Sequence, residues 1–412
     1  MNILQKLRAL PAVVKNGIII GMLAFVLGLA YPLISEWLVP EPPTVPEPRV
    51  TLPQQGESVQ TDAFSVRLFH AAMKAHPEGN ITLAPNALAV CLRHLQRLSS
   101  PDMAAGMQAL GLPQQLQASS ATVHEAACLF VDSSATLKPA TEENITYPVP
   151  FTGRLADAHR DINGRLSTYS GGGVDAVANS VTAPRGTRFI ATAALSLKAD
   201  WHVPMPLHET EKDKFNNADG SKTDVQLMKA KGKFRIAHDP QGKWVATALF
   251  LRNGTSPAAE EQDACALILI YPQEDTCLSA RPLAQQLQKE DYDAIRTALA
   301  HATPIAAEVS LPRFSMHGNT QSMAHIMHKL GLAALFAPTT TYPALTADAP
   351  FPLDAFYQQC DLHFAECEAE PGSPLAPLGI QTKLKFTRPF IWMLTPLTSP
   401  HAPYAMGVLD NM

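Results

Sequence analysis

Residues 307–314 read AEVSLPRF, a stretch in which apolar and polar side chains alternate. Alternation with a period of two is typical of a β-strand that buries one face. Residues 264–272 (ACALILIYP) form a continuous apolar run of strand length, and residues 390–394 (FIWML) and 404–409 (YAMGVL) have the same character. Runs of this kind predict fully buried strands, and we expect the last two to form a pair at the end of the chain.

Helical periodicity is found earlier in the chain. Residues 63–75 (AFSVRLFHAAMKA) place apolar side chains at helical spacing with polar ones opposite, and residues 86–98 repeat the pattern. The helix and strand signals do not alternate strictly, as they would in a protein built from βαβ units. The order therefore predicts an α+β fold with large antiparallel or mixed β-sheets and packed helices.

The composition is that of a large folded body. Of the 412 residues, 46% are apolar and 17% are charged, which excludes wholesale disorder. The net charge is -5, from 37 acidic and 32 basic residues, and no basic stripe with interleaved aromatic residues is present. We therefore expect no nucleic-acid partner. The 35 prolines favour a body rich in loops and strands.

The cysteine and histidine patterns predict no metal site and no cofactor. The six cysteines are scattered without a C-x-x-C pair or zinc spacing. Cys360 and Cys367 are close enough to be bridged in an oxidising compartment, and the sequence leaves open whether they are. His325 and His328 lie about one helical turn apart without a neighbouring carboxylate or cysteine, so we expect a structural pair.

No motif of an independent hydrolase is present. The sequence contains no G-x-S-x-G elbow, no H-E-x-x-H pair and no paired-carboxylate signature. Residues 171–173 (GGG) predict a turn. A phosphate-binding loop would lie between a strand and a helix and end in Lys-Ser or Lys-Thr, and this pattern is missing here. We expect that the protein is not an enzyme.

The amino-terminal region has the pattern of a membrane anchor. Lys6, Arg8 and Lys15 precede residues 17–34, which read GIIIGMLAFVLGLAYPLI and contain no charge. At about 1.5 Å per residue, such a helix spans roughly the hydrocarbon thickness of a bilayer. Trp37 follows where the membrane interface is expected.

The charge bias predicts the orientation of this anchor. Basic residues before the apolar run place residues 1–16 in the cytoplasm, residues 17–39 in the membrane as a signal anchor, and the body outside, in the periplasm or at the cell surface. A cleaved signal peptide is the alternative. No A-x-A site follows the run, and Pro32 lies where cleavage needs an extended segment, which favours retention.

A proline-rich segment separates this anchor from the body. Residues 39–53 read VPEPPTVPEPRVTLP. Proline at this density holds a polyproline II conformation and leaves no apolar face to bury. We expect residues 40–58 to form a stiff stalk and residues 59–412 to form one domain.

The motifs of residues 59–412 resemble those of the serpin family, in the same order. The seven matching segments are residues 80–85 (NITLAP), 162–163 with 170–174 (IN and SGGGV), 193–201 (AALSLKADW), Thr210 with Phe215 and Met228, 309–314 (VSLPRF), 330–336 (LGLAALF), and 388–390 with 406–408 (RPF and MGV). The resemblance implies a serpin fold, a monomer without catalytic residues or cofactor, and a serine or cysteine protease as partner. Serpins present an exposed loop as bait, and the cut loop inserts as a central strand of the large sheet.

The resemblance places this loop at residues 370–385, which read EPGSPLAPLGIQTKLK. Glu370 and Gly372 resemble the family's hinge, and Ser373 replaces its usual small hydroxyl residue. The loop is shorter than the family generally uses, so counting residues along it does not identify the scissile bond. Cleavage after Lys383 would suit a trypsin-like protease, and cleavage after Leu378 or Leu384 a chymotrypsin-like one.

The same loop departs from the family in its next residues. Pro374 and Pro377 stand where serpins carry small residues, with Leu375 and Leu378 as their bulky neighbours and Gly379 after them. Proline has no N–H to donate and is confined to sheet edges and bulges. In an inserted strand each proline would orphan a buried carbonyl, at about 1–3 kcal/mol each. We therefore expect that cutting the loop does not lead to full insertion.

A second departure concerns the region where a serpin's sheet opens. The family joins a serine, an asparagine and a histidine there. This chain has Ala84 and Ala193 at the first two positions, with His363 near the third. We expect that no hydrogen-bond network remains at this point.

Three functional hypotheses remain open from the sequence. The first is an anchored protease inhibitor that acts by loop insertion, and the second is an inhibitor or decoy that binds proteases without insertion. The third is a non-inhibitory serpin-fold module that binds a ligand or partner at the cell envelope.

Overall fold

The computed structural model describes residues 61–113, 116–120, 122–139, 145–252, 265–273, 279–316, 320–370, 373–380 and 382–412. The expected anchor, residues 17–39, and the expected stalk, residues 40–58, lie outside these described residues. Within the described part of the chain, no helix is both long and apolar enough to span a membrane.

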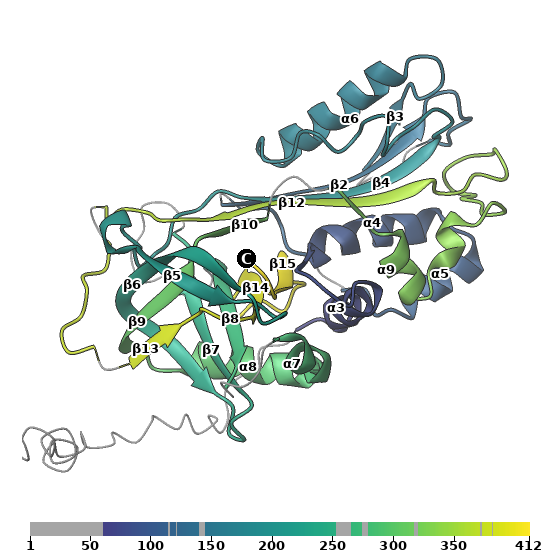
Figure 1. The fold of residues 1–412 in the computed structure, drawn as a ribbon. Helices are drawn as coiled ribbons and strands as arrows, with labels where there is room; N and C mark the ends of the chain where they lie inside the picture. The colour runs from purple at the N-terminus through teal and green to yellow at the C-terminus, as the bar shows by residue number, and fades with distance from the viewer. Residues whose placement is uncertain are drawn as a thin grey trace, which may run out of the picture. The chain divides into compact units, whose positions relative to one another are not determined.

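The smaller of the two sheets has six strands among the described residues (Figure 1). Their order is β10 (Phe314–Met316), β12 (Ala355–Phe364), β4 (Phe189–Leu197), β2 (Val123–Asp132) and β3 (Thr146–Val149), with β11 (Gln321–Ser322) also paired to β12. Strand β12 runs parallel to β4, and β2 runs antiparallel to β4. The sheet is therefore mixed, as predicted.

The larger sheet has nine strands among the described residues. Their order is β1 (Ile81–Leu83), β15 (Ala405–Leu409), β14 (Phe390–Pro396), β8 (Cys265–Pro272), β7 (Trp244–Phe250), β6 (Lys222–His238), β9 (Ile305–Pro312) and β13 (Thr382–Lys385), with β5 (Glu211–Asn216) paired to β6. The predicted apolar runs are its centre, because β8, β14 and β15 are buried almost throughout. The prediction that the last two runs pair is confirmed, since β14 and β15 are antiparallel neighbours.

Helices cover both faces of the six-stranded sheet (Figure 1). The described helices are α3 (Ala63–Ala75), α4 (Pro85–Leu98), α5 (Pro101–Gln108), α6 (Leu155–Tyr169), α7 (Arg281–Gln286), α8 (Lys289–His301), α9 (Ala324–Lys329) and the 3-10 helices η1 (Leu207–Glu209) and η2 (Ala333–Phe336). Helix α6 lies on one face, and α4 lies on the other. Both helices predicted from periodicity are confirmed as α3 and α4.

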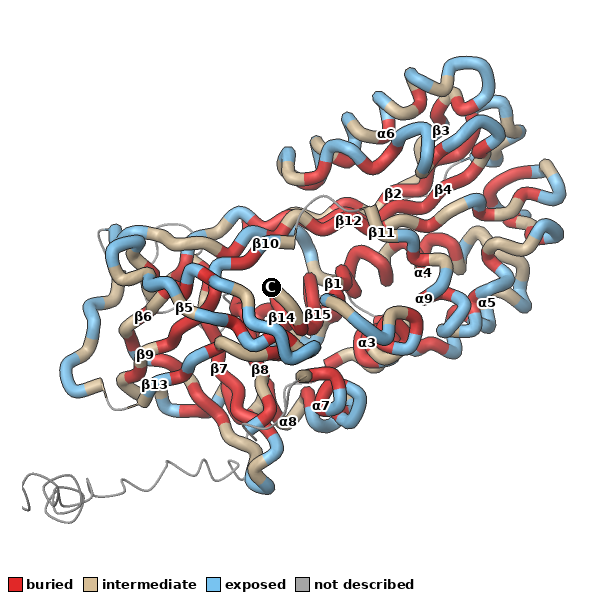
Figure 2. Tube along the Cα trace, viewed as in Figure 1, coloured by how far each residue is buried: buried red, intermediate tan, exposed pale blue. Residues whose placement is uncertain are grey.

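The start of α3 follows from its sequence. The Asp62 side chain caps the helix by accepting a hydrogen bond from the Ser65 backbone N–H at 2.8 Å. The buried face of the helix includes Phe64, Leu68 and Phe69. Figure 2 shows this inward burial across the two sheets and the helices that pack on them. Capping and amphipathicity therefore agree in this segment.

The segment AEVSLPRF forms two strands rather than one. Strand β9 ends at Pro312 and pairs with β6, whereas β10 begins at Phe314 and pairs with β12 of the other sheet. Arg313 is the residue between them, and its backbone N–H donates to the Gln226 carbonyl at 2.8 Å. The alternation seen in the sequence thus continues across a crossover that joins the two sheets.

A carboxyl group is buried beneath the six-stranded sheet. Glu125 of β2 faces the beginning of α4, where its Oε2 accepts a hydrogen bond from Asn86 Nδ2 at 2.6 Å. Its Oε1 is shielded from solvent and has no hydrogen-bond partner among the described residues. Burial raises the pKa of Glu125 to about 8, although hydrogen bonds from the Asn86 side chain and the Ala87 backbone oppose the shift.

This buried carboxyl group predicts how stability depends on pH. In the unfolded chain Glu125 ionises near its ordinary pKa of 4.5, while the folded protein keeps the proton up to about pH 8. The free energy of unfolding should therefore fall as pH rises through this interval. Glu125→Gln, which is neutral throughout, should flatten the fall and stabilise the protein at pH 8, as measured by urea denaturation at pH 5 and pH 8. The exposed Glu78→Gln is the control, and an unchanged slope in Glu125→Gln would contradict the assignment.

Candidate functional site

The chain leaves the six-stranded sheet at Glu366, just beyond the end of β12. Arg313 holds the Glu366 carboxylate through two hydrogen bonds, Nε to Oε2 at 2.8 Å and Nη2 to Oε1 at 2.6 Å. Thr210 Oγ1 donates to the same Oε1 at 2.9 Å. Burial by itself would raise the pKa of Glu366, but the hydrogen bonds from Arg313, the backbone and Thr210 outweigh burial and lower it. A charged, two-pronged contact therefore marks the exit from the sheet.

The residues on either side of Glu366 are hydrogen-bonded to the segment that follows β4. Trp201 Nε1 donates to the Ala365 carbonyl at 2.8 Å, and the Cys367 N–H donates to the Met205 carbonyl at 3.1 Å. Next along the chain, Glu368 Oε1 accepts a hydrogen bond from the Leu207 N–H at 3.1 Å. Residues 365–368, which lead into the loop, consequently lie along residues 201–207 and are not free.

A third set of contacts with the body involves two of the predicted site residues. Arg252 Nη1 pairs with the Glu370 carboxylate, and Arg252 Nη2 donates to Ser373 Oγ at 3.1 Å. The Ser373 N–H also donates to the Glu370 carbonyl at 2.9 Å. The structure thus brings Glu370 and Ser373 together. The third predicted hinge residue, Gly372, lies outside the described residues, and a hinge role for this trio stays a prediction.

The outer part of the loop carries the two most exposed large apolar side chains among the described residues. Leu375 is 92% exposed and Leu378 is 98% exposed. Pro374 and Pro377 lie beside them, and Gly379 adopts a φ of 70°, a conformation that favours glycine. In Figure 2 exposed and intermediate positions alternate along this stretch. Residues 374–380 are therefore presented to solvent as a short chain with two large apolar side chains.

The remaining two predicted site residues lie in a strand. Lys383 and Leu384 belong to β13, where they stand opposite Glu308 and Val309 of β9 in a parallel pairing. Leu384 is buried, whereas Lys383 is exposed and lies 3.6 Å from the Glu308 carboxylate. The structure separates these two residues from the exposed stretch.

The disulfide that the sequence left open is not formed. Cys360 and Cys367 are both free, as are the other cysteines among the described residues. Cys360 is buried within β12, whereas Cys367 lies beyond the end of the strand, in a backbone bridge with Met205.

The sheet next to the loop is closed. From Ala355 to Asp361, β12 pairs with Ile190 to Ser196 of β4 without a break. A further strand between β4 and β12 would require these hydrogen bonds to separate. Insertion of the loop is therefore opposed by an intact ladder.

The expectation that no hydrogen-bond network remains beneath this ladder is wrong. Gln358 of β12 stands opposite Ala193, and its Oε1 accepts a hydrogen bond from the Ala84 N–H at 2.7 Å. Its Nε2 donates to the Thr82 carbonyl at 2.9 Å. His363, which the resemblance suggested, stands opposite Ser315 at the other end of β12. A glutamine, which the sequence patterns did not single out, joins β12 to the turn between β1 and α4.

Replacement of this glutamine should weaken the fold measurably. Gln358→Met keeps the volume but orphans the Ala84 N–H and the Thr82 carbonyl, which should reduce the free energy of unfolding by about 2 kcal/mol or more. The matched control is Gln359→Met, because Gln359 is equally buried but makes one side-chain bond, accepted from Thr320 Oγ1 at 3.0 Å. Urea denaturation of the two variants measures the difference. An equal decrease in the free energy of unfolding of both variants would show that the Gln358 hydrogen bonds do not stabilise the fold more than the single Gln359 bond does.

Comparison with known proteins agrees with the fold. The family model described as Serpin (serine protease inhibitor) matches residues 59–409. The chain is 24% identical to antithrombin-III of Ovis aries over 241 residues, which is 56% of this chain and 48% of that protein. It is 20% identical to corticosteroid-binding globulin of Saimiri sciureus over 278 residues, 65% of this chain and 64% of that protein. The chain thus spans between about half and two thirds of the length of these two relatives.

Solved structures show the same architecture. A crystal structure of maspin superimposes with a TM-score of 0.73 at 17% identity, covering 85% of this chain and 97% of maspin. A serine protease inhibitor of Manduca sexta, serpin-12, superimposes with a TM-score of 0.69 at 17% identity, covering 84% of this chain and 97% of that one. At this identity the likeness concerns the fold alone. The family match, which covers most of the chain, goes further: this protein belongs to the serpin family.

Proposed function

We propose that this serpin presents residues 374–380 as bait to a serine or cysteine protease outside the membrane, and that it does so without full insertion of the cut loop. The observation that carries the proposal is the exposure of Leu375 and Leu378, at 92% and 98%. These residues follow directly after the residues that are hydrogen-bonded to the body. A protease needs an accessible peptide on which to close, and this stretch offers one.

The family match bears out the prediction about catalysis. The matching family is one of serine protease inhibitors, and the protein is not an enzyme. Any chemistry at the loop would accordingly be supplied by the protease that attacks it.

The surroundings of the loop favour Leu378–Gly379 as the scissile bond. Leu384 is buried and Lys383 belongs to the β9–β13 ladder, so neither can enter a protease cleft without loss of strand pairing. Leu378 is neither buried nor paired in a strand. A large apolar side chain before the scissile bond suits a chymotrypsin-like specificity pocket. Pro377 then occupies the preceding position.

Two features of the described residues oppose trapping by insertion. Pro374 and Pro377 would enter the strand without N–H donors, which leaves unpaired carbonyls on its neighbours. Residues 365–373 would in addition have to release Trp201, Arg313 and Arg252 before they could move. Both features favour cleavage without a conformational change, or reversible binding.

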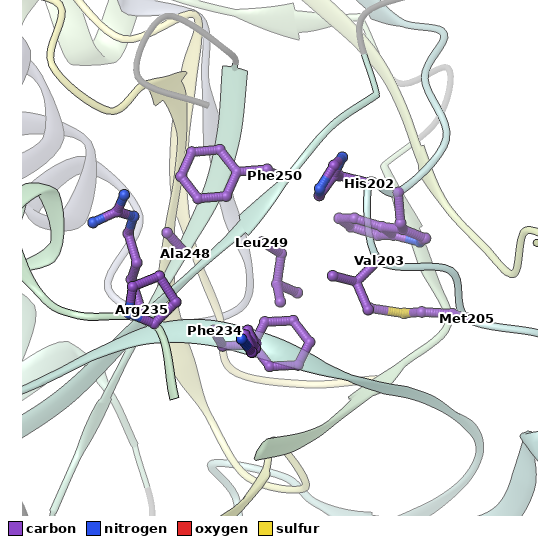
Figure 3. A pocket seen from close by; sticks show the side chains of 11 residues that line it. His202, Val203, Met205, Phe234, Arg235, Ala248, Leu249 and Phe250 are labelled. Atoms are coloured by element: carbon purple, nitrogen blue, oxygen red, sulfur yellow. The ribbon is translucent and has the colours of Figure 1, made fainter. Parts of the chain in front are cut away.

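The alternative is a non-inhibitory serpin-fold binding module at the cell envelope. One relative is named for binding corticosteroids, which directs attention to cavities. A cavity near the base of the loop is lined by Trp201, Val203, Phe234, Leu249 and Phe250 (Figure 3), but its volume is about 20 Å³. That space accommodates about one water molecule. This cavity therefore does not support binding of a small organic ligand.

The location outside the membrane is part of the proposal and rests on the charge bias around residues 17–39. Protease added to intact spheroplasts should degrade the body, which should fractionate with the membrane before treatment. A soluble body with a new amino terminus beyond residue 30 would show that the segment is a cleaved signal peptide instead.

The mechanism is tested by cutting the loop. Chymotrypsin should cleave between Leu378 and Lys383, change the melting temperature little and form no SDS-stable complex. Replacement of both prolines, Pro374→Ala with Pro377→Ala, should move the cleaved protein toward greater heat resistance, because the orphaned carbonyls regain donors. The intact forms of both proteins serve as controls. A large rise in melting temperature on cleavage of the parent, or a covalent complex, would restore the trapping mechanism.

A further inference from the structure

The contacts of the loop divide it sharply at Ser373. Ala365 and Glu368, which precede the loop, and Ser373 within it are each bonded to the body, and the last of these contacts comes from Arg252. Immediately after it, Leu375 is 92% exposed. The free part of the bait therefore begins where the Arg252 contact ends.

Arg252 is itself firmly placed. It follows β7, and its backbone N–H donates to the Asp200 carbonyl at 2.8 Å. The preceding residue, Leu251, forms a backbone bridge with Trp201, which holds the base of the loop. The Arg252 side chain is 17% exposed, against 62% for Glu370. The guanidinium thus belongs to the body of the protein, and the loop is the partner that is held.

The two loop residues that contact this guanidinium are also hydrogen-bonded to each other. Ser373 Oγ accepts two hydrogen bonds, from Arg252 Nη2 at 3.1 Å and from the Glu370 N–H at 3.0 Å. The Ser373 N–H returns a bond to the Glu370 carbonyl. The two Nη atoms of the guanidinium contact a carboxylate and a hydroxyl at the same time. A lysine carries a single ammonium group, which reproduces this geometry poorly.

We propose that Arg252 is a positioning residue for the bait: it holds Glu370 and Ser373 to the body and so sets the length and direction of the chain that a protease meets. The inference rests on the proposed function and deepens it, because it assigns control of the bait to a residue outside the loop. Loss of these contacts leaves Glu370 and Ser373 unattached, so the free chain would begin nearer to Glu368, the preceding residue that is bonded to the body. A longer free chain must be ordered again when a protease binds it, which weakens binding without altering the bond that is cut.

These contacts can be tested by local proteolysis of the full-length protein. A glutamyl endopeptidase should cut the Glu368–Ala369 bond slowly in the parent. It should cut about two- to fivefold faster in Arg252→Ala, the change expected on loss of one partly exposed ion pair. Arg252→Lys should fall between the two. Arg160→Ala, which removes an exposed arginine paired with Asp157 on α6, is the matched control and should leave the rate unchanged.

A second readout separates positioning from a structural role. In Arg252→Ala the KM for chymotryptic cleavage after Leu378 should rise several-fold while kcat holds. Ser373→Ala, which removes the hydroxyl but leaves Arg252 in place, should show the same trend if Arg252→Ala is too unstable to measure. Protection of Glu368–Ala369 equal to the parent, or an unchanged KM, would overturn the proposal. Neither measurement requires the protein to inhibit a protease, so loss of the proposed function would leave this test intact.

Discussion

The parallel pairing of β4 with β12 is the constraint on which the rest of the structure depends. Because Ala355–Asp361 lie opposite Ile190–Ser196, β12 is held inside the six-stranded sheet, and its end at Phe364 fixes where the loop begins. Parallel neighbours need a long connection. Here that connection, residues 198–354, includes strands β5 to β9 of the larger sheet. One pairing therefore ties the two sheets together and aims the loop.

Two guanidinium–carboxylate contacts then hold the loop, and their surroundings differ. The Glu366 side chain is 10% exposed, with two bonds from Arg313, whereas Glu370 is 62% exposed against Arg252. Exposed ion pairs contribute little and are screened by salt, while partly buried two-pronged pairs are stronger. The contact at Glu366 is thus suited to a permanent anchor, and the contact at Glu370 to one that can release.

The chemistry of the loop divides along the same line. The segment that leads into it, residues 365–368, is bonded to residues 201–210, and its outer part is apolar, proline-rich and exposed. Proline limits the conformations of the outer part before any partner binds, which reduces the ordering that binding requires. The same lack of N–H groups makes this part a poor central strand. Features that suit presentation of a bait are therefore the ones that oppose its insertion.

The sequence by itself indicated which segments become buried strands, because short apolar runs such as residues 264–272 have the length of a strand buried on both faces. It also determined that two prolines interrupt the loop. Tertiary structure alone decided which glutamate marks the exit from the sheet. Glu366 is bound by Arg313, 53 positions away, and nothing in the local pattern distinguishes it from Glu370. Tertiary structure also decided that Gln358, and not His363, supports the sheet, because strand register sets which side chain faces Ala84 across 274 positions of sequence. Local patterns report the burial of a residue, whereas a long-range polar contact depends on the register and crossing of strands, which no local pattern contains.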